Sequence, residues 1–446
     1  MVAATASEVP LISDRSADDA RPLKVIHIAG VSGILAGIRF PQYIKDLDLV
    51  IYEKNPDIGG TWWENRYPGC ACDAPAHTYQ LSFEANPDGR SSTHQLGRSL
   101  STGKQWQLMK LQVVETDEIF EDTADVLVTG IGVLNSWKWP DIPGLHDFQG
   151  KLLHSAKWDE NFDYKGSALQ NTVRPIYEDI MKARLAKRPD MANRIIPPFP
   201  PFSKRLTPGP GYLEALTADN VSVFNTRISK VTATGTTTSG EEHRPVDVIV
   251  CATGFDTSFM GRFPIRSRKG VTLEEQRQSQ RRHATYLSMT AADFPNFFMC
   301  MGPNSAVGNG SLVILIERYV EYAAQCMAKM QTGNIRTMAP RPEAVDNFTR
   351  YCHNFFKRTV YSEECSSWYK TIFPARSEDE EPVAEVSGLW PGSSLHGAKV
   401  LEKPRWEDFK YTNVDGNPFR WNGYGWVKGD REALNGFDSG NPALSY

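Results

Sequence analysis

Short apolar runs alternate with glycine-rich turns near the start of the chain. Residues 24–28 (KVIHI) form an apolar run of strand length, residues 29–37 (AGVSGILAG) are small and then apolar at helical spacing, and residues 48–53 (DLVIYE) form a second apolar run. A strand, a tight turn, a helix and a second strand in this order begin a doubly wound dinucleotide-binding fold. Glu53 follows Gly33 by 20 positions, the spacing expected of a carboxylate that binds a ribose hydroxyl.

Two later apolar runs, residues 125–128 (DVLV) and 246–252 (VDVIVCA), each end at a glycine. We interpret both as strands whose ends approach a cofactor. Residues 311–330 have helical spacing after the loop GNG, and Ser311 is the expected N-cap. Residues 232–240 (TATGTTTSG) are interpreted as a polar loop between strands.

Two other stretches show weaker patterns. Residues 90–112 show no clear periodicity. Residues 332–446 are expected to mix short helices with aromatic-rich coil.

Composition narrows the class of protein. A chain of 446 residues is too long to fold around a single hydrophobic core. Its net charge of −4 argues against a nucleic-acid partner. The seven cysteines lack zinc-ligand spacing, so we expect free thiols, a reducing compartment and no metal. Residues 1–22 are polar, which predicts a disordered leader rather than a signal peptide. No apolar run approaches the ~18 residues of a membrane span, so we expect a cytoplasmic protein.

The segment 59–79 (GGTWWENRYPGCACDAPAHTY) has neither helical nor strand periodicity. It contains four large aromatic residues and turn signals at Gly59-Gly60 and Pro68-Gly69. Long loops rich in rigid aromatic side chains usually line ligand sites. The loop follows Glu53 directly, and it is therefore expected to lie beside the nucleotide.

A second motif, F-x-G-x-x-x-H-x-x-x-W, spans Phe148, Gly150, His154 and Trp158. With this motif the chain resembles the Baeyer–Villiger monooxygenases, a family of FAD-binding flavoproteins. The resemblance covers most of residues 24–430. Its other parts are GGTW, NRYPG and CD within the loop 59–79, and then Lys204-Arg205, CATGFD, GPNS, GNGS and LWPGSS. The fungal members that act in secondary metabolism resemble this chain most.

The resemblance implies an α/β fold. A doubly wound, Rossmann-like FAD-binding domain would carry an inserted, truncated NADPH-binding domain that is also Rossmann-like. The expected boundaries are 23–158 for the first part of the FAD domain, 159–245 for the truncated NADPH domain, and 246–446 for the second part of the FAD domain with a C-terminal region.

The resemblance also implies the chemistry. FAD is reduced by NADPH, and one oxygen atom of O2 is inserted into a small-molecule ketone to give an ester or lactone. Arg205 matches the arginine that stabilises negative charge on the oxygenating group, and Asp73 matches the carboxylate that holds this arginine. The implied FAD contacts are Gly30, Ser32, Gly33, Glu53, Gly60, Thr61, Trp62, Asp73, Tyr79 and Asn304. The implied NADP contacts are Ala71, Cys72, Asp73, His154, Trp158, Ser167 and Lys204.

The chain departs from the family pattern in three places. Ile28 stands where the first glycine of the nucleotide turn belongs, residues 90–112 are short, and the strand and second glycine-rich turn expected after Trp158 are reduced to the tail SALQ at 167–170. Two other readings therefore stay open. The protein could be a degenerate flavoprotein or pseudoenzyme that has lost NADPH binding, or a flavin oxidase or N-hydroxylase.

Overall fold

The computed structural model describes most of the chain. The described residues are 16–28, 30–65, 67, 79–83, 107–112, 116–132, 139–149, 151–154, 174–197, 204, 211–259, 263–308, 310–359, 361, 367–377 and 379–430.

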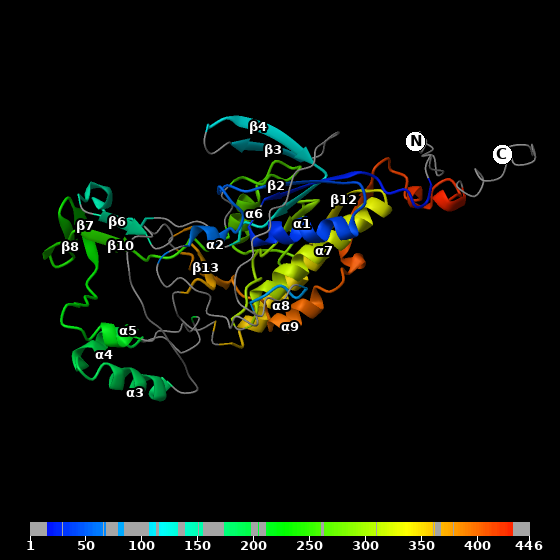
Figure 1. Ribbon diagram of the computed structural model, residues 1–446. Helices are drawn as coiled ribbons and strands as arrows, with labels where there is room; N and C mark the ends of the chain where they lie inside the picture. The colour runs from blue at the N-terminus through cyan, green and yellow to red at the C-terminus, as the bar shows by residue number, and fades with distance from the viewer. Residues whose placement is uncertain are drawn as a thin grey trace, which may run out of the picture.

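A parallel sheet forms the centre of the larger part of the molecule (Figure 1). Its strand order is β11 (Phe297–Met299), β5 (Val126–Thr129), β1 (Leu23–Ile28) and β2 (Leu47–Tyr52), and every neighbouring pair is parallel. The helix α1 (Val31–Tyr43) connects β1 to β2 and packs with α7 (Leu312–Thr332). The three strands and the two helices predicted for this part from hydrophobic periodicity are thus confirmed.

The sheet is buried because successive side chains of its strands alternate between two apolar clusters. Val25, Val126 and Phe298 contribute to the cluster that contains α1 and α7. Ile26 and Leu127 contribute to the cluster on the other face. His27 interrupts this apolar pattern, since it is fully buried and its ring lies 6.4 Å from that of Phe40.

Two regions contain strands that the sequence did not predict. β3 (Gln107–Gln112) pairs antiparallel with β4 (Ile119–Ala124), so the end of the stretch 90–112 is a strand. β7 (Ile228–Thr232), β8 (Gly235–Thr238) and β9 (His243–Pro245) form an antiparallel sheet, so the predicted polar loop 232–240 is wrong. β-branched threonines favour strands, and this preference outweighs the polarity of the segment.

A second group of elements lies on the left of Figure 1. It comprises β6 (Lys151–His154), α3 (Arg174–Arg184), α4 (Ala192–Ile195), α5 (Tyr212–Ala215), the sheet β7–β8–β9 and β10 (Val248–Cys251). β6 and β10 pair as a two-stranded parallel sheet, with His154 opposite Cys251. Val248 and Val250 of β10 are 36% and 43% exposed. The domain boundaries stay a prediction.

The C-terminal half is more regular than the sequence suggested. α8 (Pro342–Phe356) is a 15-residue helix, and β12 (Ile335–Pro340) pairs antiparallel with β15 (Phe409–Asn413). β13 (Lys370–Phe373) pairs with β14 (Val383–Val386), and α6 (Leu273–Gln280) and α9 (Ser394–Val400) complete this half. None of the described helices is long and apolar enough to cross a membrane.

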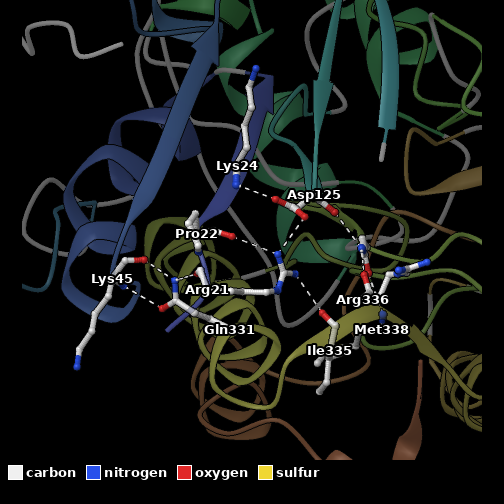
Figure 2. Close-up of polar contacts among 10 residues, drawn as sticks. Arg21, Pro22, Lys24, Lys45, Asp125, Gln331, Ile335, Arg336 and Met338 are labelled. Carbon is white, nitrogen blue, oxygen red and sulfur yellow. Dashed lines mark hydrogen bonds and ion pairs between the residues drawn. The ribbon is translucent and has the colours of Figure 1, made fainter. Parts of the chain in front are cut away.

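A polar network joins distant segments at the amino ends of the sheet strands (Figure 2). The Asp125 carboxylate accepts hydrogen bonds from Arg21 (3.1 Å) and from the backbone N–H of Lys24 (2.9 Å). Arg21 also donates to the carbonyl of Ile335, and Gln331 of α7 donates to the carbonyl of Arg21. The network fixes the chain before β1 to β5, α7 and β12.

Candidate nucleotide-binding site

The turn between β1 and α1 is built from glycine backbone. Gly30 precedes α1 with a φ of 114°, and a Cβ placed on it would lie 2.4 Å from the carbonyl oxygen of Gly130. No side chain fits there, so only glycine allows this approach. Gly130 follows β5, and the N–H of Gly33 donates to the carbonyl of Gly30 at 3.0 Å. The turn therefore forms although Ile28, the last residue of β1, replaces the first glycine of the fingerprint.

The aromatic loop begins against this turn. Gly60 has a φ of 52°, and a Cβ on it would lie 3.0 Å from the Cα of Gly30. Thr61 and Trp62 follow in the short helix α2 (Thr61–Glu64). The indole of Trp62 donates to the hydroxyl of Tyr79 at 3.3 Å, and the two rings meet edge to face at 5.9 Å. The two described ends of the loop thus lie together beside the turn.

Glu53 directly follows β2, and the two oxygens of its carboxylate differ in their hydrogen bonds. Its Oε1 accepts from the backbone N–H and the side-chain amide of Asn55, at 3.1 and 2.9 Å. Its Oε2 is buried and has no hydrogen-bond partner among the residues that the structure describes. A buried carboxylate oxygen without a donor costs free energy. This oxygen is therefore suited to a donor that a ligand brings, such as the hydroxyl of a ribose.

The remaining predicted contacts are placed as follows. Ser32 is buried in the first turn of α1. Asn304 is buried with a φ of 61°, and its side-chain amide donates to the carbonyls of Val386 and Leu389. Both amide hydrogens of Asn304 are thus used on the protein. Lys204 is half-buried, and His154 ends β6. Ala71, Cys72, Asp73, Trp158, Ser167 and Arg205 lie outside the described residues.

Ser311 is placed as predicted but does not cap. It stands at the N-cap of α7, yet its side chain makes no capping hydrogen bond, unlike Ser393, which accepts from the N–H of His396 before α9. Gly130, the glycine that ends the predicted strand 125–128, lies against the turn at Gly30. That this strand end approaches a cofactor stays a prediction.

Taken together, the parallel sheet, the glycine turn at its carboxyl edge and the free acid after β2 define a dinucleotide-binding protein of the Rossmann class. A family model described as an NAD(P)-binding Rossmann-like domain matches residues 29–92.

Known proteins resemble the chain over nearly its whole length. The FAD-binding monooxygenase moxY of Dothistroma septosporum is 30% identical, over 96% of this chain and 86% of that protein. The FAD-binding monooxygenase tazF of Aspergillus terreus is 31% identical, over 92% of this chain and 93% of that protein. A solved closed structure of cyclohexanone monooxygenase has a TM-score of 0.69 at 19% identity, covering 89% of this chain and all of that one.

The chain belongs to the family of FAD-binding monooxygenases. The family, the fold class and the flavoprotein class predicted from the sequence are thereby confirmed, and FAD and NADPH are confirmed as the cofactors at the level of the family. The match to moxY extends over 548 residues, more than the 446 of this chain, so the relative has internal segments without a counterpart here.

Proposed function

We propose that the protein is an FAD- and NADPH-dependent Baeyer–Villiger monooxygenase that inserts one oxygen atom of O2 into a small ketone to give an ester or lactone. The single observation that carries the proposal is the Oε2 of Glu53, which is buried and without a partner in the described part of the chain, together with the closely packed glycines of the β1–α1 turn. Family membership supports the reaction class.

The described residues fit the nucleotide half of FAD. Glu53 would accept a hydrogen bond from a ribose hydroxyl. Gly30 and Gly33, at the start of the 13-residue helix α1, would leave the pyrophosphate in contact with bare backbone and the positive end of the helix dipole. Gly60, Thr61, Trp62 and Tyr79 would line the same ligand from the aromatic loop. When bound, reduced FAD supplies the electrons that activate O2.

Arg205 and Asp73 are the proposed catalytic residues. A guanidinium is charged at every physiological pH, so Arg205 would stabilise the negative charge that develops on oxygen during the attack on a ketone. Asp73 would hold the guanidinium in place. Lys204 and His154 are the proposed NADPH contacts.

We propose a role in fungal secondary metabolism, because the chain is similar to fungal members of the family. moxY and tazF are both fungal FAD-binding monooxygenases. A Baeyer–Villiger monooxygenase of Pseudomonas aeruginosa is 27% identical over 84% of this chain and 88% of that protein, which supports the ketone as substrate class.

Three measurements test the proposal in sequence. The purified protein should carry flavin absorbance, NADPH should bleach it anaerobically, and a ketone panel with oxygen should yield esters or lactones. Flavin that millimolar NADPH leaves oxidised would instead support the degenerate flavoprotein, and hydrogen peroxide without ester would support an oxidase. N-oxygenated amines would support an N-hydroxylase.

The role of Arg205 has its own test. Arg205→Ala should abolish ester formation while NADPH still reduces the flavin, because the guanidinium acts after reduction. Ester produced by this variant at the parent rate would exclude the proposed role.

A further inference from the structure

Residues 79–83 anchor the far end of the aromatic loop on the core. Leu81 packs against the cluster that contains α1 and α7. Ser82 donates twice to Glu317 of α7, from its backbone N–H to Oε1 at 2.6 Å and from its hydroxyl to Oε2 at 2.5 Å. The guanidinium of Arg39 lies 4.1 Å from the centre of the Phe83 ring. Three successive residues are therefore fixed on two helices.

Glu317 is an unusual residue for the interior of α7. It is 2% exposed, and glutamates this buried are rare unless they are paired. Within the part of the chain that the structure describes, its hydrogen bonds all come from Ser82, and no cation pairs with it. Glu321, one turn later, differs because it pairs with Arg39 at 3.3 Å and with Arg318 at 2.5 Å.

This contrast assigns different roles to the two acids. Glu321 joins α7 to α1 through its ion pair with Arg39. An apolar residue at position 317 would fill the core at a lower desolvation cost than a carboxylate. The carboxylate instead accepts hydrogen bonds from the backbone N–H and the hydroxyl of Ser82. An apolar side chain at position 317 could accept neither of them. Its position is thus explained by Ser82 rather than by core packing.

A short series of contacts leads from Ser82 to the nucleotide turn. Tyr79 precedes Ser82 by three positions, and its hydroxyl accepts from Trp62. Trp62 lies two positions after Gly60, which contacts the turn at Gly30. A shift of residues 79–83 would therefore separate Tyr79 from Trp62 at the edge of the nucleotide site.

We propose that Glu317 is a positioning residue for the flavin site, which holds Ser82 so that Tyr79 closes on Trp62 beside the glycine turn. This inference rests on the proposed function, because it takes FAD as the ligand of that site. Glu317 acts through the loop and does not itself contact the flavin.

Glu317→Gln tests the inference because it keeps the shape of the side chain. The amide offers one acceptor oxygen and turns an NH2 group toward a donor of Ser82. Loss of a hydrogen bond to a charged group corresponds to about a tenfold or greater rise in the Kd for FAD. The visible circular dichroism of the bound flavin should change as well, since Tyr79 and Trp62 move. Ser82→Ala should show a smaller effect in the same direction, and Ser82→Thr, which keeps the hydroxyl, should restore the parent Kd.

Gln331→Ala is the matched control on the same helix, because this side chain is also buried but bonds to Arg21 and Lys45 and not to residues 79–83. It should lower the melting temperature of the flavin-free protein and leave the Kd for FAD near the parent value. If Glu317→Gln and Ser82→Ala behave like this control, Glu317 is only a packing group and the inference is wrong. Should Glu317→Gln fail to fold, Ser82→Ala decides, because Ser82 is exposed. A parent protein that binds no FAD would refute the proposed function first, which separates the two failures.

Discussion

Burial of His27 is expected to make the stability of the protein depend on pH below neutrality. The imidazole lies near the end of β1 with no exposed surface, and among the described residues neither ring nitrogen has a hydrogen-bond partner. Desolvation lowers the pKa of His27 from 6.5 to about 4, opposed only in part by the backbone of Ile28. The native state therefore holds this ring neutral at a pH where the unfolded chain has already protonated it.

The sign and size of the effect follow from the two pKa values. Above pH 6.5 the ring is neutral in both states and contributes no pH dependence. As the pH falls below 6.5, the unfolded chain binds a proton that the native state refuses, so stability falls. The loss is about 2 kcal/mol at pH 5 and about 3 kcal/mol at pH 4.

His27→Val removes the titrating group and keeps a β-branched residue that suits a buried strand. Urea denaturation of parent and variant at pH 7, 6 and 5, at fixed flavin loading, measures the free energy of unfolding. The variant should gain about 2 kcal/mol over the parent between pH 7 and pH 5. His353→Gln, on an exposed position of α8, should leave the pH profile as it is. Parallel profiles for parent and His27→Val would refute the reasoning.

Two further predictions concern the glycine turn and the polar network. Gly30→Ala should lose bound flavin and about 2–4 kcal/mol of stability, because its Cβ would collide with the carbonyl of Gly130. The flavin released on heating and the melting temperature measure these losses. Gly429→Ala is the control, because its Cβ would meet no atom of the described residues within 4 Å. Asp125→Ala should cost about 2–3 kcal/mol, since it removes the acceptor of the Lys24 N–H and the carboxylate that pairs with Arg21. An unchanged melting temperature would contradict either prediction.

The parts of the fold that the sequence predicted are those with strong local signals. The strand, turn, helix and strand at residues 23–52 follow from apolar periodicity and glycines, and Glu53 follows from its spacing to Gly33. β8 was missed because threonine and glycine suit both loops and exposed strands, so only pairing with β7 decides.

In the site, too, contacts between residues far apart in the sequence could not be predicted. Arg205 and Asp73 were predicted by resemblance, and they lie outside the described residues, so their roles stay predictions. The role of Glu317 could not be predicted, because Ser82 is 235 positions away along the chain. A glutamate in an apolar helix indicates an unusual position but does not name its partner.

The exposed valines of β10 have a consequence for handling the purified protein. Parallel strands are normally covered on both faces, whereas Val248 and Val250 are exposed and β10 pairs with β6 alone among the described strands. An uncovered apolar strand edge is a template for pairing with other chains. Concentrated preparations should therefore precipitate through this small sheet, and a Val248→Thr/Val250→Thr variant should remain monodisperse in light scattering at concentrations where the parent scatters.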